Sequence, residues 1–583
     1  MTDMNKQPWP VVSIAEAHAL MTQTDTAFEM ETREVHGVRM RVWKNAPATM
    51  REVFLAGRVH GAKTFVVYED ERASFESFSR AAVALAHTFL DGGVQKGDRI
   101  AIAMRNVPEW PVTFFAALLV GAIATPLNAW WTAPELEYGL QDSGAKIAVV
   151  DAERFERIQG ALPNLRALER VYVSRAIALP AVGRVSSLAA VIGATNDWAL
   201  LTDQPLPAVP IDSDDDATIF YTSGTTGKPK GALGTHRNGV STVVASGFSA
   251  QRNFLRRGDP IPKPEDRLTQ RASLLSVPFF HTTGCQAILC PSLAAGSKIV
   301  AMHHWDTEQA MALIERERCT QVGGVPTIAW QILEHPARAK YDLSCIEVMS
   351  YGGAPAAPEL VTRIKQEFPA TLPGNGWGMT ETSATFTHIG AEDYQTHPES
   401  CGIAMPVCDL RIVGDKGEDL PLGAIGEIWG KGPNVVKGYW QKPKDTAETF
   451  VDGWVKTGDL GRLDDEGFLY IVDRKKDMLI RGGENIYCIE VEDALCAHPA
   501  IMDAGVIGRA HKILGEEPVA VVTVKPDQTT SEAALRAFVG ERLAAFKVPV
   551  VIVLLNETLP RNANGKILKK ELRQYFDQAV AAA

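Results

Sequence analysis

Residues 221–231, YTSGTTGKPKG, decide how this chain is interpreted. The segment contains three glycines, four hydroxyl residues besides the tyrosine, two lysines and no acid. Glycines let backbone N–H groups converge on an anion, and hydroxyl and ammonium groups add further donors. Residues 217–221 are apolar and β-prone, and residues 232–235 can form a second strand. The pattern therefore predicts a polyphosphate-binding loop at the tip of a β-hairpin.

This loop departs from the Walker A pattern. Thr222 stands where the first glycine is required, and Pro229 follows the lysine in place of serine or threonine. A polar glycine-rich turn without a ligand is the alternative, but such turns seldom carry two lysines and a Thr-Thr pair. The candidate phosphate ligands are Thr222, Ser223, Gly224, Thr225, Thr226, Gly227, Lys228 and Lys230.

The segment closely resembles the phosphate loop of the adenylate-forming superfamily, which includes acyl- and aryl-CoA synthetases, nonribosomal-peptide adenylation domains and firefly luciferase. Further strings follow in the family's order, namely SYGGAP at 350–355, NGWGMTET at 375–382, WVKTGDLG at 454–461, YIVDRKKD at 470–477 and PRNANGK at 560–566. The resemblance implies an α/β fold with a large domain of β/α subdomains, a small β-barrel-like subdomain and a mobile α+β C-terminal domain. It also implies that the chain uses ATP, Mg²⁺ and coenzyme A.

Length and composition set the broad class of the protein. A chain of 583 residues is too long for one core, so two or more domains are expected. The net charge of −11 argues against a nucleic-acid partner, which would require a basic face. The eight cysteines form no CxxC pair, which favours reduced, mostly buried thiols. No basic region followed by an apolar run begins the chain, and the longest apolar stretch, 112–127, is short for a membrane span. A cytoplasmic protein is expected.

The pattern of elements predicts domain boundaries. Residues 1–50 are expected to form an N-terminal arm and 51–472 the large AMP-binding domain, in which β/α alternation from Thr64 indicates a parallel sheet. Frequent glycines at about 400–472 indicate a β-rich subdomain. The charged break at 473–477 is expected to be a hinge, followed by a mobile domain at 478–583.

Glycine pairs and a tryptophan are the candidates for the adenine site. The resemblance places Gly352, Gly353, Ala354 and Pro355 against adenine and substrate, and Trp377, Gly378 and Met379 beside the purine. Trp377 replaces the tyrosine that is more usual in the family, and its ring could still stack on adenine. The alternative for the glycine pairs is tight turns alone.

The resemblance assigns polar roles to four further positions. Thr380 would donate to the α-phosphate, and Glu381 would hold Mg²⁺, since an acid beside a phosphate needs a metal between them. Asp459 would accept the ribose hydroxyls, and Arg474 would reach ribose or phosphate. For Glu381, Asp459 and Arg474 the alternative is an ordinary solvated turn or loop residue.

The C-terminal part supplies the residues expected to act in turn. By the resemblance, Lys476 is the hinge residue, Gly482 and Gly483 let the backbone pass close to the pantetheine arm of CoA, and Lys566 serves the first half-reaction. His281, in SVPFFHTTGC, is placed beside the reacting carboxylate, although a core histidine would be the better interpretation from residue type alone.

The reaction implied is ATP-dependent ligation of a carboxylic acid to CoA through an acyl-adenylate, with release of pyrophosphate and then AMP. No acid lies between Phe279 and Gly284, which disfavours an amino-acid substrate and leaves a fatty or aromatic monocarboxylate. The alternatives are an enzyme that loads a separate acyl carrier protein or acts oxidatively, and a non-catalytic nucleotide-binding module. The sequence leaves the oligomeric state open, with a homodimer as one option.

Overall fold

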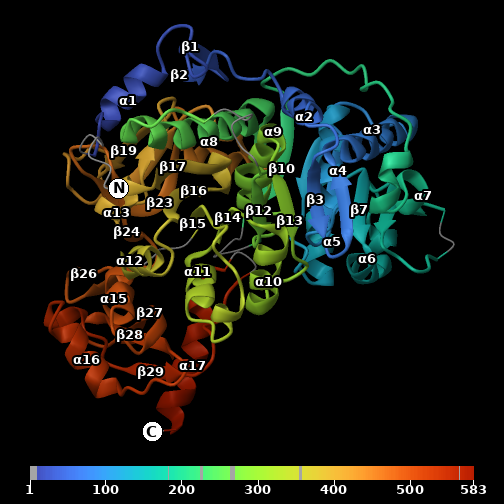
Figure 1. Ribbon diagram of the computed structural model, residues 1–583. Helices are drawn as coiled ribbons and strands as arrows, with labels where there is room; N and C mark the ends of the chain where they lie inside the picture. The colour runs from blue at the N-terminus through green and yellow to red at the C-terminus, as the bar shows by residue number, and fades with distance from the viewer. Residues whose placement is uncertain are drawn as a thin grey trace.

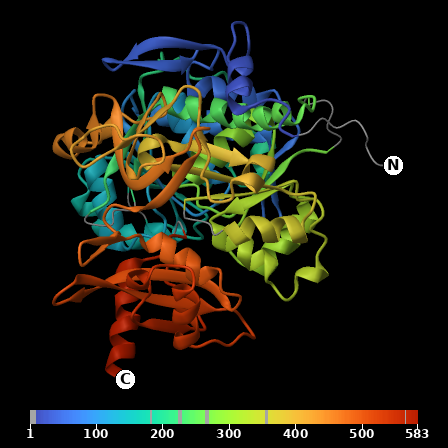
Figure 2. The same cartoon turned by 90° about the vertical axis from the view of Figure 1, so that its left-hand side faces the viewer.

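The computed structural model describes residues 9–180, 183–222, 228–262, 269–353, 358–562 and 565–582, with the backbone alone for 577–582. The C-terminal domain lies below the large domain, on the side opposite the N-terminal hairpin (Figures 1 and 2). Within these residues, no helix is long and apolar enough to cross a membrane.

The large domain is built on two extended sheets. The first has eight strands in the order β21-β11-β10-β6-β5-β7-β8-β9. Its strands are β5 (Arg99–Ala103), β6 (Ile123–Pro126), β7 (Ile147–Asp151), β8 (Arg170–Ser174), β9 (Val185–Ser187), β10 (Asp216–Tyr221), β11 (Gly231–Thr235) and β21 (Gly438–Tyr439). From β10 to β9 the neighbours run parallel, as the alternation predicted, and β5 and β7 are almost wholly buried. Such strands consist of continuous apolar runs because helices cover both faces of a parallel sheet.

The second sheet has nine strands in the order β18-β17-β16-β15-β14-β12-β13-β3-β4. These are β3 (Thr64–Tyr68), β4 (Glu71–Ser74), β12 (Ala272–Leu275), β13 (Lys298–Ala301), β14 (Gln321–Gly324), β15 (Val348–Gly352), β16 (Leu372–Met379), β17 (Ala384–Gly390) and β18 (Ile403–Ala404). The helices that pack around both sheets include α2 (Met50–Arg58), α3 (Phe75–Asp91), α4 (Glu109–Leu119), α5 (Ala133–Ser143), α6 (Ala152–Ile158), α8 (His236–Arg257), α9 (Cys290–Ala295), α10 (Thr307–Glu317), α11 (Pro326–Leu333) and α12 (Pro358–Glu367).

The part of the N-terminal arm that the structure describes, from Trp9 onward, packs on α8, above β16 and β17 (Figure 1). It contains α1 (Ile14–Met21) and the hairpin of β1 (Met30–Val35) and β2 (Val38–Trp43). The rings of Phe28 and Trp43 lie 5.3 and 5.6 Å from that of Phe248 on α8. α8 begins at Thr235, whose side chain accepts the N–H of Asn238, so the helix directly follows the hairpin that carries the phosphate loop.

Two smaller units follow. The β-rich subdomain is an antiparallel sheet of β19 (Asp409–Val413), β20 (Gly426–Lys431), β22 (Phe450–Val451), β23 (Trp454–Leu463) and β24 (Leu469–Arg474). The C-terminal domain contains β25 (Leu479–Arg481), β26 (Glu484–Ile486), α15 (Cys488–Cys496), β27 (Ile501–His511), β28 (Gly515–Val524), α16 (Glu532–Gly540), β29 (Ile552–Leu555) and α17 (Lys569–Ala582). It has its own apolar core, centred on residues such as Val491, Val506 and Val522. All eight cysteines are free, and six are buried.

Candidate active site

The hairpin predicted around the phosphate loop is confirmed. β10 and β11 pair antiparallel with Tyr221 opposite Gly231. At the open end, Thr222 N–H donates to the carbonyl of Lys230 at 2.9 Å, and Lys230 N–H donates to Thr222 Oγ1 at 3.2 Å. Ser223, Gly224, Thr225, Thr226 and Gly227 lie outside the described residues, so the structure gives the base of the loop and not its tip.

An aspartate on α5 anchors the entering strand. Asp142 accepts the hydroxyls of Tyr221 at 3.0 Å and Tyr138 at 3.2 Å, and the ammonium of Lys442 at 2.7 Å. The same single O–H of Tyr138 is shared with the carbonyl of Pro229, whose oxygen lies 3.0 Å away, and the Lys228 ammonium lies 4.8 Å from the centre of the Tyr138 ring. These contacts fix both ends of the loop to α5.

A tyrosine on β21 connects the phosphate loop to the predicted metal residue. Tyr439 donates its hydroxyl to Glu381 Oε1 at 2.6 Å, and the ammonium of Lys230 lies 5.1 Å from the centre of the Tyr439 ring. Lys230 also pairs with Asp445. Burial raises the pKa of Glu381, and the hydrogen bond from Tyr439 opposes that shift. Glu381 and the base of the phosphate loop are therefore neighbours.

The turn after β16 is shaped by a steric constraint. A Cβ on Gly378 would lie 1.6 Å from the carbonyl oxygen of Ala384, so no other residue fits without moving the backbone. Thr380 and Glu381 follow in a single 3₁₀ turn. Ser383 and Ala384 then have φ of +51° and +79°, conformations that are costly for residues with a Cβ. The backbone here is held in an unusual shape beside the site.

Trp377 and Asp459 form a direct pair. The indole N–H of Trp377 donates to Asp459 Oδ2 at 2.9 Å, and Arg474 Nε lies 3.3 Å from Asp459 Oδ1. The Trp377 ring also meets Phe386 edge to face, with centres 5.9 Å apart. The structure thus brings together three residues that the sequence placed at the nucleoside end of the site.

Lys566 lies at the same place although it belongs to the C-terminal domain. Burial lowers its pKa to about 7, reinforced by the positive charge of Arg474 and opposed by the carboxylate of Asp459. Its own turn is closed by two bonds, since Lys566 N–H donates to Asn562 Oδ1 at 3.0 Å and Asn562 N–H donates to the Lys566 carbonyl at 2.9 Å. A lysine held beside Asp459 and Arg474 faces the nucleotide site that the sequence predicts.

The loop that carries Gly482 and Gly483 is oriented differently. Both glycines are exposed and have φ of +62° and +92°, and nothing lies within 4 Å of a Cβ placed on Gly483. Lys476, the predicted hinge residue, lies in the turn between β24 and β25. The domain therefore presents Lys566 to the cleft while the glycine pair faces outward.

The remaining predicted residues are partly described. His281 does not stand at a strand end as expected, because β12 ends at Leu275 and His281 lies in the turn that opens a π-helical segment, Thr283–Leu289. His281 Nδ1 accepts the N–H of Thr283 at 3.2 Å, and burial lowers its pKa to about 4.

A Cβ on Gly352 would lie 2.7 Å from the carbonyl oxygen of Gly376. Gly353 has φ of +75°, and Ala354 and Pro355 lie outside the described residues.

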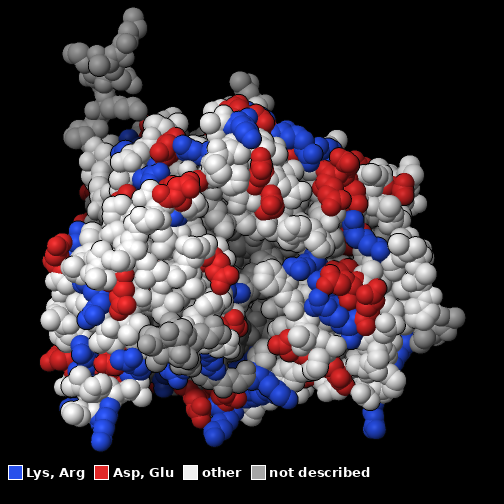
Figure 3. Space-filling view, turned by 90° about the horizontal axis from the view of Figure 1, so that it is seen from below, with Lys and Arg blue, Asp and Glu red and all other residues white. Residues whose placement is uncertain are grey.

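The residues present fit the ligands that the family requires. Among the described residues no group of three or more His, Cys, Asp or Glu side chains could hold a metal. One buried carboxylate, Glu381, fits a Mg²⁺ ion that takes its other oxygens from phosphates and water. The face seen from below is hollowed near its centre, with both positive and negative side chains around it (Figure 3).

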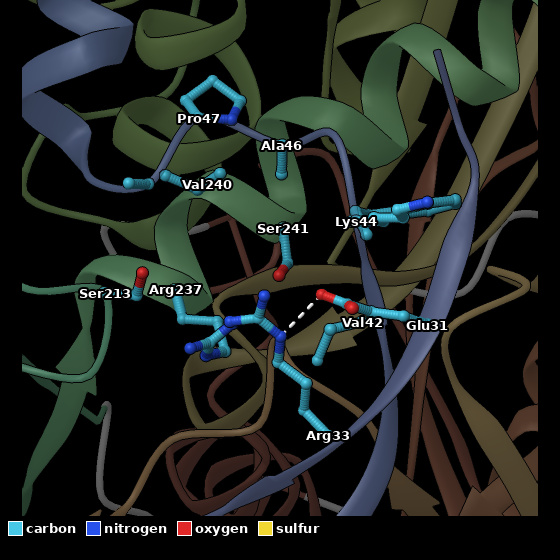
Figure 4. Close-up of a pocket in the computed structure, with 12 residues that line it drawn as sticks. Glu31, Arg33, Val42, Lys44, Ala46, Pro47, Ser213, Arg237, Val240 and Ser241 are labelled. Atoms are coloured by element: carbon cyan, nitrogen blue, oxygen red, sulfur yellow. Dashed lines mark hydrogen bonds and ion pairs between the residues drawn. The ribbon is translucent and has the colours of Figure 1, made fainter. Parts of the chain in front are cut away.

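A separate cavity of about 190 Å³ lies between the N-terminal hairpin and the start of α8 (Figure 4). Arg33 and Arg237 face it, but each is paired with a carboxylate. Arg33 Nε lies 2.5 Å from Glu31, and Arg237 Nε lies 2.6 Å from Asp214. None of the predicted site residues lines this cavity, so it is separate from the nucleotide site that the sequence predicts.

Sequence reasoning missed Tyr439, Asp142 and Tyr138. Their partners are 58, 79 and 91 residues away in the chain, so no local pattern marks them. Only the pairing of β11 with β21 brings Tyr439 to Glu381. A polar residue directly after an apolar strand is a sequence signal for a functional site. Tyr439, Asp142 and Tyr138 do not follow such a strand, so this signal does not mark them.

Comparison with known proteins places the chain in a family. The AMP-binding enzyme family matches residues 54–440, and the AMP-binding enzyme C-terminal domain matches residues 490–566. The chain belongs to the AMP-binding enzyme family.

Its relatives include several CoA ligases. Feruloyl-CoA synthase from Amycolatopsis sp is 33% identical over 503 residues, which cover 86% of this chain and 94% of that protein. A long-chain-fatty-acid–CoA ligase from Bacillus subtilis is 32% identical over 538 residues, which cover 88% and 91%. The o-succinylbenzoate CoA synthetase of Bacillus subtilis in complex with its acyl-adenylate intermediate is 28% identical, with a TM-score of 0.72 over 90% of this chain and 98% of that one.

These comparisons confirm the expected class of enzyme. The chain is an AMP-forming acid–thiol ligase with the fold of adenylate-forming enzymes, and its cofactors are ATP, Mg²⁺ and CoA. The same Bacillus subtilis synthetase has been solved with ATP and a magnesium ion, at a TM-score of 0.73. The relatives named here are CoA ligases, so the carrier-protein alternative gains no support from them.

Proposed function

We propose that this ligase activates a fatty or aromatic monocarboxylic acid, and that Lys566 serves the first of its two half-reactions. The observation that carries the assignment of Lys566 is its half-buried position near the charges of Arg474 and Asp459, while Gly482 and Gly483 are exposed. The C-terminal domain therefore turns the surface that carries Lys566 toward the large domain and leaves the surface that carries the glycine pair exposed.

The first half-reaction joins two anions, so charge neutralisation and alignment supply most of the catalysis. In this proposal the acid's carboxylate attacks the α-phosphorus of ATP, and pyrophosphate leaves. Lys566 bridges carboxylate and α-phosphate, and Thr380 donates to the same phosphate. Lys228 and Lys230, at the base of the phosphate loop, hold the leaving group. Mg²⁺ on Glu381 neutralises phosphate charge when it is bound.

The second half-reaction needs a different surface of the C-terminal domain. The CoA thiol attacks the acyl carbonyl and AMP leaves, with Gly482 and Gly483 lining the path of the thiol arm. Rotation about Lys476 exchanges this surface for Lys566. Closure in each state keeps water from the labile adenylate.

The substrate class follows from the residues that the sequence places around the acyl chain, namely His281, Thr282, Cys285, Val325, Tyr351, Trp377 and Met379. This set carries no fixed charge, because burial keeps His281 neutral at physiological pH and the other members do not ionise there. Five of them, Thr282, Cys285, Val325, Tyr351 and Trp377, are buried. Such walls favour an apolar or aromatic acyl group over a diacid or an amino acid.

A panel of carboxylates scored by CoA-dependent AMP release tests this assignment. Fatty and aromatic monocarboxylates, ferulate among them, are expected to turn over, and dicarboxylates and amino acids are expected to be poor substrates. Best turnover of a dicarboxylate would reject the substrate class. AMP release that is independent of CoA but dependent on a carrier protein would reject CoA as the acyl acceptor.

Location and assembly are proposed on other grounds. The eight free cysteines support a reducing compartment such as the cytoplasm. A homodimer stays a prediction, and light scattering would show it as a mass near twice 63.3 kDa.

A further inference from the structure

The C-terminal domain touches the large domain at two points on one helix. The first is Val325, the residue before α11. A Cβ placed on Gly565 would lie 2.6 Å from Val325 Cγ2 and 3.1 Å from Val325 Cβ, so the turn before Lys566 rests directly on this side chain. The second is Trp330 on α11, where the ammonium of Lys525 lies 5.5 Å from the centre of the indole ring.

These two contacts come from separate loops of the C-terminal domain. Gly565 belongs to the turn that carries Lys566, and Lys525 directly follows β28. Lys525 N–H donates to the carbonyl of Ala500 at 2.8 Å, which ties its backbone to the body of that domain. Trp330 follows Val325 by five positions, a rise of about 7.5 Å along the helix. Contact at two points along one helix restricts rotation of the domain more than a single contact would.

The contacts are specific to one position of the domain. Val325 and Trp330 belong to the large domain, and Gly565 and Lys525 lie beyond the turn that contains Lys476. A large rotation about that turn would separate both pairs, since each depends on close approach across the interface. We propose that α11 is a docking platform for the adenylate-forming state, and that the Lys525–Trp330 contact positions Lys566 for the first half-reaction. This inference rests on the proposed function of Lys566 and of the hinge.

Lys525 is a positioning residue in this scheme, because its ammonium contacts the indole of Trp330 and none of the reacting groups. A cation over an indole is attracted by the electron-rich face, and a neutral amide of similar shape loses that attraction. Lys525→Gln is therefore expected to lower the population of the docked state. Lys525→Arg is expected to restore it, because a guanidinium also stacks well on indole.

Cross-linking measures docking without any substrate. In the pair Val325→Cys and Gly565→Cys the two Cβ atoms would start 3.1 Å apart, so a small outward shift brings them to the separation of about 3.5–4.5 Å that disulfides need. Mild oxidation should join them, and peptide mapping separates this bond from the eight native cysteines. Adding Lys525→Gln should slow the cross-link by about three- to tenfold, and Lys525→Arg should not. Arg536→Gln removes an exposed cation from α16 of the same domain and serves as the charge control.

The half-reactions give the functional arm of the test. In the otherwise native chain, Lys525→Gln should slow acid-dependent pyrophosphate exchange by a similar factor and leave thioester formation from a supplied acyl-adenylate unchanged. Absence of the cross-link, an equal effect of Arg536→Gln, or equal slowing of both half-reactions would overturn the proposal. A protein that cross-links as expected but turns over no acid would instead count against the proposed function.

Discussion

The indole N–H of Trp377 and the carboxylate of Asp459 form a hydrogen bond of 2.9 Å in which both side chains are buried. Arg474 holds the other carboxylate oxygen at 3.3 Å. A carboxylate fixed from both sides is oriented before any ribose reaches it, which lowers the cost of ordering it on binding. A tyrosine or phenylalanine at 377 would lack the indole donor. The departure from the family's usual tyrosine therefore has a physical consequence here.

Trp377→Phe keeps an aromatic face for adenine and removes the donor to Asp459. We expect the KM for ATP to rise by about three- to tenfold, with a smaller change in kcat, because a charged acceptor loses one hydrogen bond. Pyrophosphate exchange with ATP and with 3′-deoxy-ATP measures the effect, and discrimination between the two should weaken. Trp377→Tyr is the control for ring size. If discrimination between ATP and 3′-deoxy-ATP is unchanged, stacking of the ring alone explains the contribution of Trp377 to ATP binding.

Gly378→Ala tests the steric constraint at the end of β16. The added methyl would lie 1.6 Å from the Ala384 carbonyl, where neither backbone can yield cheaply. We expect a loss of about 3 kcal/mol or more in the free energy of unfolding, or local rearrangement of the Thr380 turn with loss of pyrophosphate exchange. Denaturant melts and exchange rates check this. Gly160→Ala, where nothing lies within 4 Å of the new methyl, should be nearly neutral.

The sequence predicted those parts of the site that depend on short, ordered strings. The β10–β11 hairpin and the cluster of Asp459 and Arg474 with Trp377 both followed from local composition or from resemblance, and the hinge at 473–477 stays a prediction. The contact of Tyr439 with Glu381 did not, because it depends on a short strand, Gly438–Tyr439, added to the edge of β11. The position of His281 was wrong for a similar reason, since an apolar run that ends in Phe-Phe-His does not reveal that the strand stops at Leu275. Local pattern determines which residues form an element, and pairing between distant strands determines which side chains meet.

Lys566→Ala should separate the two half-reactions. The side chain is expected to contact both anions only while the adenylate forms, so its loss should slow pyrophosphate exchange by about 10²–10³-fold. Thioester formation from a supplied acyl-adenylate should be far less affected. Quenched-flow measurement of each step provides the comparison. Equal damage to both steps would remove Lys566 from its proposed role.

The pH dependence of adenylation should report the same lysine. Burial and the charge of Arg474 lower the pKa of Lys566 to about 7, and only its protonated form can bridge two anions. In the free enzyme, kcat/KM for adenylation should therefore be greatest below pH 7 and fall as the pH rises through that value. The fall of kcat, which reports the enzyme–substrate complex, should occur at higher pH than the fall of kcat/KM, because bound phosphates favour the protonated form of the amine. Lys566→Arg, whose side chain stays charged, should lose this falling limb even if its rate is lower.

Lys476→Pro tests the hinge, because proline fixes φ near −65° and restricts the residue before it. If the domain rotates about this turn, each half-reaction should survive in the state that the substitution permits, while the complete cycle slows by about tenfold or more. Steady-state AMP release, compared with single-turnover rates of both steps, measures the difference. Lys475→Pro, one position earlier, would also remove the hydrogen bond from Lys475 N–H to the Gly458 carbonyl, so Lys476→Ala is the cleaner control for loss of the side chain. Wild-type turnover in Lys476→Pro would place the pivot elsewhere in the chain.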